Sequence, residues 1–163
     1  IFFGSDDGHI YGVDQYGNSL PGWPKDTGAN ITGSVAFSDL DGDDSPEVVS
    51  TNGDGSIFVY HLDGSEVTYF PITGDFSYSA SPQILDLDGD NDLEVFAGTT
   101  LGLEVFDIKT DGSNDIYWST HRSTQSRTGY IEFSSSCAAA DVNSDGIIDI
   151  LDIVTMANIV MGS

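Results

Sequence analysis

Hydrophobic positions along this chain come in short runs, separated by stretches rich in Gly, Asp, Asn and Ser. Runs of this kind, bounded by turn residues, predict many short strands joined by tight turns. We predict strands near residues 34–39, 46–51, 56–61 and 66–71, and a corresponding set 47 residues later. The segments PEVV (46–49) and LEVF (93–96) do not alternate strictly between apolar and polar residues. This pattern predicts inner strands that are covered on both faces.

The sequence repeats itself with a period of 47 residues. The acidic stretch SDLDGDDSPEVVS, residues 38–50, returns as LDLDGDNDLEVFA at residues 85–97. The positions related by this offset are Asp39 and Asp86, Asp41 and Asp88, Asp43 and Asp90, Glu47 and Glu94, Gly8, Gly55 and Gly102, Pro24 and Pro71, Ser34 and Ser81, and Ile1, Val48 and Val95. A period of this length, built from several short strands, is typical of a β-propeller blade.

The predicted fold class is mainly β, a partial β-propeller of about 2.5 blades of four antiparallel strands, followed by an EF-hand-like loop and helix. The propeller-like part spans residues 1–133, with a half unit at 1–33 and units at 34–80 and 81–133, and the C-terminal part spans 134–163. Closed rings usually have four to eight blades. Either further blades lie on other sequence, or other copies of this chain cover the open ends.

Each acidic stretch predicts a site for a hard divalent cation. Closely spaced carboxylates repel one another, and protonating them near neutral pH would need large pKa shifts. The spacing D-x-D-G-D-x-x-x-E offers oxygen ligands, with a glycine that allows a sharp turn. The predicted ligands are Asp39, Asp41, Asp43, the carbonyl of Ser45 and Glu47 in the first loop, and Asp86, Asp88, Asp90, the carbonyl of Asp92 and Glu94 in the second. These ligands favour Ca²⁺ over Zn²⁺; the alternative is a pair of ordinary acidic turns.

A third loop lies in the sequence ADVNSDGIIDILDIVTMANIVMGS at the C-terminal end. Its spacing matches the EF-hand loop, with Asp in place of Glu at the last position. The predicted ligands are Asp141, Asn143, Asp145, the carbonyl of Ile147, Asp149 and Asp152. A helix is predicted from about Ile150 to Met161, and its narrow polar stripe predicts cover on two sides. The cover would come from the propeller and another protein or copy, or from a missing part of the same chain.

Two resemblances follow from these motifs. DLDGDDSPEVV and DLDGDNDLEVF, within residues 1–133, resemble FG-GAP/VCBS repeats, the calcium-loop blades of integrin-α-like propellers. This resemblance implies an extracellular, calcium-stabilised propeller in which the ions brace the strand connections, but it implies no activity. The C-terminal segment resembles one calcium-loop-plus-helix half of a dockerin, the module that docks enzymes onto cohesin-bearing scaffolds.

The net charge and the absence of known catalytic motifs exclude several classes of function. The 27 acidic residues against 4 basic ones give a formal net charge of −23, which argues against nucleic acid and membrane-surface partners. No G-x-S-x-G, H-E-x-x-H or phosphate-cradling loop is present, so we predict that the chain is not an enzyme. His9, His61 and His121 have no metal-type partner at a useful spacing, and Cys137 is predicted to be a small buried apolar residue.

Two functions fit these features. The first is a non-catalytic, extracellular calcium-binding module for protein–protein assembly, as a self-assembling fibre or matrix subunit, because open strand edges demand cover. Its partners would be another protein or further copies of the chain, through the terminal helix and the open blade edges. The alternative is a C-terminal docking appendage that attaches a larger secreted enzyme, such as a glycoside hydrolase or protease, to a cohesin-like scaffold. Both predict a secreted or cell-surface location, with about three Ca²⁺ sites.

Overall fold

In the computed structural model, the described residues are 1–114, 117–123, 127 and 129. The chain divides into a compact part, Ile1–Ile131, and a second part, Glu132–Ser163. The predicted C-terminal loop and helix lie outside the described residues, as do all six of that loop's predicted ligands. Within the described residues, no helix has the length and apolar character needed to cross a membrane.

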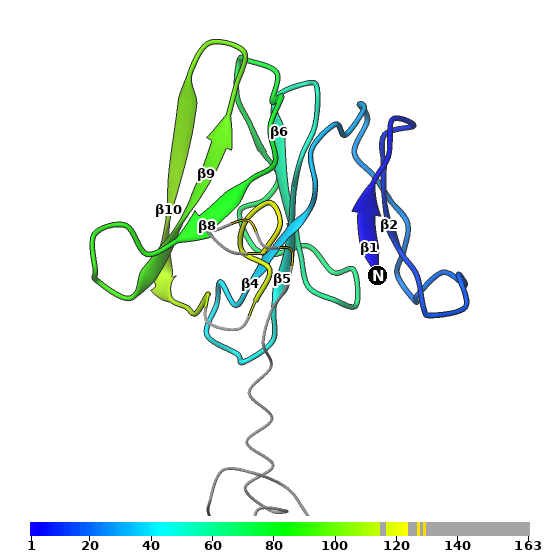
Figure 1. Ribbon diagram of the computed structural model, residues 1–163, viewed down its shortest axis with the longest axis horizontal. Helices are drawn as coiled ribbons and strands as arrows, with labels where there is room; N and C mark the ends of the chain where they lie inside the picture. Colours follow the sequence, from blue (N-terminus) through cyan, green and yellow to red (C-terminus); the bar gives the residue numbers. More distant parts are fainter. Residues whose placement is uncertain (115–116, 124–126, 128, 130–163) are drawn as a thin grey trace, which may run out of the picture. The chain divides into compact units, whose positions relative to one another are not determined.

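Three antiparallel sheets form the compact part (Figure 1). The first sheet consists of β1 (Phe2–Gly4), β2 (His9–Gly12) and β3 (Lys25–Asp26). The second consists of β4 (Ala36–Ser38), β5 (Glu47–Thr51), β6 (Ser56–Tyr60) and β7 (Ile72–Thr73). The third consists of β8 (Gln83–Leu85), β9 (Asp92–Gly98) and β10 (Leu103–Asp111). The prediction of a mainly β fold is therefore confirmed for the described part of the chain.

The 47-residue repeat is visible in the backbone of the first two sheets. Strands β1, β2 and β3 occupy the positions of β5, β6 and β7 shifted by this offset. The turns repeat too, because Gly8 and Gly55 have φ values of 84° and 86°, and the peptide bonds before Pro24 and Pro71 are both cis. The segment predicted as a half unit, residues 1–33, contains three strands.

The predicted position of the outermost strand of the second sheet, residues 66–71, was wrong. The stretch 66–71 forms a loop, and β7 lies at Ile72–Thr73 instead. Tyr69 has a φ of 76°, outside the extended region that a strand needs. Pro71 has no N–H to donate to a strand ladder. Before this proline, Glu66 forms only an isolated bridge with Tyr60, and the strand proper begins after it.

A fourth strand of the third sheet, expected near residues 113–118, is likewise not found among the described residues. Instead, Ser113 forms an isolated bridge with Asp39. The N–H of Phe37 in β4 donates to the carbonyl of Trp118 at 2.8 Å. The described residues of this segment therefore lie beside β4, an edge strand of the second sheet, and β10 is left as an edge strand of the third.

The second sheet is buried on both faces, as the segment PEVV predicted. All residues of β5 and β6 are buried. Successive side chains of a strand point to opposite faces, so Val48 packs with Ile10 and Trp23 of the first repeat, whereas Val49 packs with Val95 of β9. Two apolar clusters therefore hold this sheet, and with it the ends of the acidic loop that joins β4 to β5.

The third sheet departs from the repeat by one residue of register. Thr51 pairs with Ile57 in the second sheet, but Gly98 pairs with Leu103 in the third, where the strict offset would give residue 104. Gly102 also lacks the positive φ of its two predicted counterparts. The predicted equivalence of Gly102 is therefore wrong, because the hairpin in the third sheet is one residue tighter.

This slip changes which side chains of β10 are covered. A shift of one residue moves a strand's side chains to the opposite face. Phe106, which pairs with Val95, packs against the cluster between the second and third sheets. Val105 and Leu103 lie on the opposite face of the strand and are 46% and 64% exposed. The third sheet thus carries an uncovered apolar face.

Candidate metal-binding loops

The first acidic loop curls around a buried aspartate between β4 and β5. The carboxylate of Asp39 accepts hydrogen bonds from the backbone N–H groups of Gly42 at 2.7 Å, Asp43 at 3.2 Å and Asp44 at 3.0 Å. Gly42 and Asp44 have φ values of 76° and 65°, a region that Gly and Asp tolerate better than most residues. As a result, one carboxylate oxygen each from Asp39, Asp41 and Asp43 lie within 4.8 Å of one another.

The second acidic loop, between β8 and β9, has the same construction. Asp86 accepts hydrogen bonds from Gly89 N–H at 2.6 Å and Asn91 N–H at 3.3 Å. Gly89 and Asn91 have φ values of 83° and 75°. Oxygens of Asp86, Asp88 and Asp90 lie within 4.8 Å of one another. The structure therefore brings together the first three predicted carboxylates of each loop, on backbones that turn at equivalent positions.

The glutamate at the ninth position of each loop is buried in the strand that follows, as the first residue of β5 and the third of β9. Glu47 accepts a hydrogen bond from Leu40 N–H at 2.7 Å, and Glu94 accepts one from Leu87 N–H at 2.6 Å. Burial raises the pKa of Glu47 to about 6, with a further contribution from the charge of Asp41, despite the hydrogen bond from Leu40. A buried carboxylate is costly unless it is paired, so these glutamates favour a cation at the loops.

The two residues whose carbonyls were predicted as ligands also occupy equivalent places. Ser45 N–H donates to Asp43 at 2.8 Å, and Asp92 N–H donates to Asp90 at 3.2 Å. The side-chain oxygen Oδ1 of Asp92 is buried and has no hydrogen-bond partner among the described residues. A buried oxygen of this kind calls for a bound ion or water. Together with the clustered carboxylates, it is an oxygen donor set that fits Ca²⁺.

A lysine distinguishes the second loop from the first. Lys109 Nζ lies 2.5 Å from Asp107, 3.4 Å from Asp92 and 3.9 Å from Asp90. The hydrogen bond with Asp107 is the main reason why the pKa of Lys109 lies above its usual value. Among the described ion pairs, none brings a lysine or arginine to the three aspartates of the first loop. The second loop thus already carries a partial internal counter-charge.

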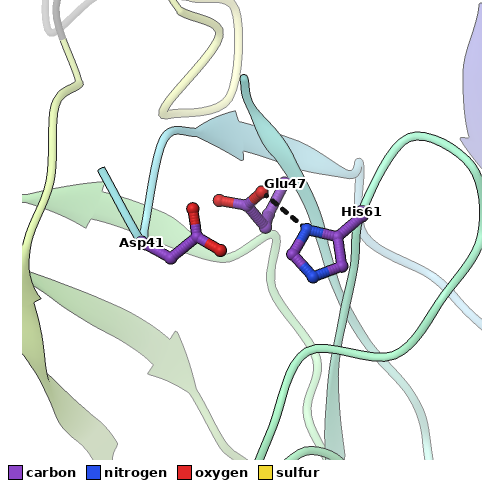
Figure 2. Close-up of side chains that lie close together, drawn as sticks. All are labelled: Asp41, Glu47 and His61. Carbon is purple, nitrogen blue, oxygen red and sulfur yellow. Dashed lines mark hydrogen bonds and ion pairs between the residues drawn. The ribbon is translucent and has the colours of Figure 1, made fainter. Parts of the chain in front are cut away.

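A histidine that the sequence did not assign to metal chemistry adjoins the first loop. His61 follows β6, and its Nδ1 lies 3.2 Å from Oε1 of Glu47. Figure 2 shows this imidazole beside the carboxylates of Glu47 and Asp41, and ligand atoms of the three lie within 4.8 Å of one another. The prediction that His61 has no metal-type partner is therefore wrong. Only the register of the β5–β6 hairpin could have revealed the contact, since the residues are 14 apart.

The two loop glycines give a matched test of this geometry. At Gly89 an added Cβ would meet nothing within 4 Å, whereas at Gly42 it would lie 2.7 Å from the carbonyl oxygen of Asp111. We expect Gly89→Ala to lower the free energy of unfolding by about 1–2 kcal/mol through its positive φ alone. Gly42→Ala should cost at least about 1 kcal/mol more, since the Asp111 backbone must move. Urea denaturation at millimolar calcium measures both, and equal costs would contradict the packing of Gly42 against Asp111.

Comparison with known proteins gives one family match. The family described as FG-GAP-like repeat matches residues 39–97, which begin at the first aspartate of the first loop and include the whole second loop. FG-GAP repeats are structural repeats that are usually non-catalytic, and they are typical of extracellular and surface proteins. A search of the curated proteins found no match. The matched segment covers both acidic loops and the strands β5, β6 and β7 of the second sheet, but not β4.

Proposed function

We propose that this chain is an extracellular, calcium-binding repeat module without catalytic activity, which mediates assembly between proteins. In this proposal the three sheets are blades of an incomplete β-propeller. The observation that carries the proposal is the pair of acidic loops, whose backbones turn at equivalent positions and whose first three carboxylates converge. Two loops alike in backbone and donor set are better explained by a shared ligand than by two acidic turns formed independently.

Calcium would act on the connections between strands. The first loop joins β4 to β5 and the second joins β8 to β9, so each ion would tie an edge strand of its sheet to the strand beside it. The ligands would be the carboxylates at positions 1, 3, 5 and 9, with a backbone carbonyl from Ser45 or Asp92. An ion at each loop would also offset part of the net charge of −23, which otherwise opposes the compact state.

The uncovered sheet faces support a role in assembly. At one end, Ile1 and Phe3 are 74% and 45% exposed, and Phe3 stacks on Tyr11 with ring centroids 5.3 Å apart. At the other end lie Leu103 and Val105 of β10, also exposed. Large exposed apolar patches mark interaction sites more often than scattered single residues do. We infer that both end faces are covered by protein, either by further copies of this chain or by a separate partner.

The calcium part of the proposal is tested by isothermal titration calorimetry on the full chain. We expect about three calcium ions per chain, one at each acidic loop and one at the C-terminal loop. Asp39→Asn and Asp86→Asn should each remove one ion from the measured stoichiometry. Because Lys109 already neutralises part of the charge of the second loop, the calcium ion lost with Asp86→Asn should be bound more weakly than the ion lost with Asp39→Asn. Asp54→Asn changes an exposed aspartate outside the loops and serves as the control.

The assembly part is tested by light scattering at millimolar calcium and again after EDTA. We expect a mean mass that grows with protein concentration in calcium and falls on chelation. Full calcium stoichiometry in both loop variants would contradict the calcium sites. A monomer at every concentration, with normal calcium binding, would instead favour the docking appendage of a larger secreted protein.

A further inference from the structure

The two acidic loops differ in the residue that faces their buried glutamate. The register of β5 and β6 places His61 opposite Glu47, just beyond the last paired residues of the hairpin. In the third sheet the residue opposite Glu94 is Asp107. An imidazole nitrogen is therefore available at the first loop, and at the second the corresponding donor is a carboxylate that Lys109 already binds.

We propose that Asp41, Glu47 and His61 form a binding site for a first-row transition-metal dication such as Zn²⁺ or Co²⁺. The imidazole would supply the nitrogen ligand, and the two carboxylates would supply oxygen ligands. This proposal rests on the proposed function in one respect, since Asp41 and Glu47 are ligands both in the transition-metal site and in the proposed calcium site. It goes further by giving the first loop a metal preference that the second loop does not share.

The distances between the donor atoms suit such an ion. Zn²⁺ binds nitrogen and oxygen at about 2.0–2.2 Å, so neighbouring ligands of a tetrahedral site lie about 3.4 Å apart. Nδ1 of His61 and Oε1 of Glu47 are 3.2 Å apart. An oxygen of Asp41 lies within 4.8 Å of both. Asp41 is exposed on its loop, so in this proposal its side chain would rotate to supply the third ligand. Nδ1 can bind a metal once the ring proton lies on Nε2.

The surroundings leave room for an ion and its remaining water ligands. A cavity of about 440 Å³ is lined by Glu47 and His61 together with Asp43, Ser45 and Asp63. A second cavity, of about 630 Å³, is lined by Asp41 and again by His61. His61 is one-third exposed and Glu47 fully buried. The site thus has one buried anionic ligand, one side chain at the entrance, and open space on both sides.

The choice of metal follows from the donor types. Imidazole suits Zn²⁺, Cu²⁺, Fe²⁺ and Ni²⁺, whereas sites built only from carboxylates and carbonyls suit Mg²⁺, Ca²⁺ and Mn²⁺. The second loop contains only oxygen donors among the predicted ligands. The first loop would then accept a borderline ion as well as Ca²⁺, whereas the second loop, of otherwise equivalent construction, would accept hard ions.

The test is Co²⁺ and Zn²⁺ binding to the full chain carrying Cys137→Ser, which removes the one thiol of the sequence. Co²⁺ is followed by its visible absorption and Zn²⁺ by calorimetry, both with calcium present. We expect His61→Gln to weaken Co²⁺ and Zn²⁺ binding by at least about tenfold. A loss of this size is typical even when the mutated residue only hydrogen-bonds to a metal ligand. Calcium binding to the second loop should stay within about twofold of the parent. His9→Gln is the matched control, because His9 lies 3.5 Å from a single carboxylate, Asp7.

The outcomes separate this proposal from the proposed function. Loss of Co²⁺ binding in His61→Gln, but not in His9→Gln, supports the site. Equal Co²⁺ binding in the parent and His61→Gln overturns it, and normal calcium stoichiometry in the same proteins leaves the calcium function standing. A parent chain that binds calcium but neither Co²⁺ nor Zn²⁺ at the first loop also overturns it. If the parent binds none of these ions, both proposals fall.

Discussion

Chelation with EDTA is expected to lower the free energy of unfolding of the compact part by about 3 to 5 kcal/mol relative to 10 mM Ca²⁺. The reason is mass action, since an ion that binds only the folded chain stabilises it by RT ln(1 + [L]/Kd). Extracellular calcium sites typically have Kd values of about 10⁻⁴ to 10⁻³ M, so each loop contributes about 1.4 to 2.7 kcal/mol. Urea unfolding measures the difference, with tryptophan fluorescence as the probe; one of the two tryptophans, Trp23, is buried between the first two sheets.

Two controls separate calcium binding from a general effect of salt. Replacing calcium by 10 mM Mg²⁺ keeps the ionic strength, but Mg²⁺ demands a stricter octahedral geometry and gives up its water reluctantly. We therefore expect Mg²⁺ to restore little of the lost stability. The double variant Asp39→Asn, Asp86→Asn should show almost no difference between calcium and EDTA. An unchanged unfolding midpoint of the parent chain in EDTA would contradict the proposed role of the ions.

Ile57→Ala is expected to lower the free energy of unfolding by about 2 to 5 kcal/mol, measured by urea denaturation in calcium. Ile57 is fully buried in the cluster between the second and third sheets, where it lies near Val95 and Ile84. Truncation removes the buried methyl and methylene groups and leaves a cavity that neighbouring strands can fill only in part. The variant thus tests whether these two sheets form one cooperative core.

Ile10 gives a matched comparison for this prediction. It lies 47 residues before Ile57, is also fully buried, and packs in the cluster between the first and second sheets. We expect Ile10→Ala to have a cost of the same order as Ile57→Ala. Leu101→Ala, at a residue that is 75% exposed, should change stability by no more than about 0.5 kcal/mol. A loss below about 1 kcal/mol for either isoleucine would contradict the packing at that cluster.

The two loops illustrate how a repeat can diverge in its electrostatic surroundings while it keeps its backbone. Both turn around a first aspartate and both bury a glutamate at the ninth position. The hairpin that follows each loop then presents a different side chain to this glutamate: His61 in the second sheet and Asp107 in the third. The difference in electrostatic environment thus comes from a neighbouring strand connection, outside the loop motif itself.

Features that depend on a few consecutive residues could be predicted from the sequence. The acidic loops are of this kind, because the turn at Gly42 and the hydrogen bonds that Asp39 accepts involve residues at most five apart. The strands β4, β5 and β6 were also predicted at nearly their observed positions, because their apolar runs are bounded by turn residues. Burial of the second sheet on both faces followed from the same apolar runs.

By itself, the sequence thus determined the period of 47 residues, the mainly β character and the grouping of three aspartates in each acidic loop. The tertiary structure alone decided the register of the third sheet, the position of β7, and the contacts that His61 and Lys109 make with the loops. These features depend on the pairing of separate segments, and a slip of one residue in that pairing reverses the faces of a strand. A pattern of consecutive residues does not determine such a pairing, because the register of the strands depends on how all the sheets pack together.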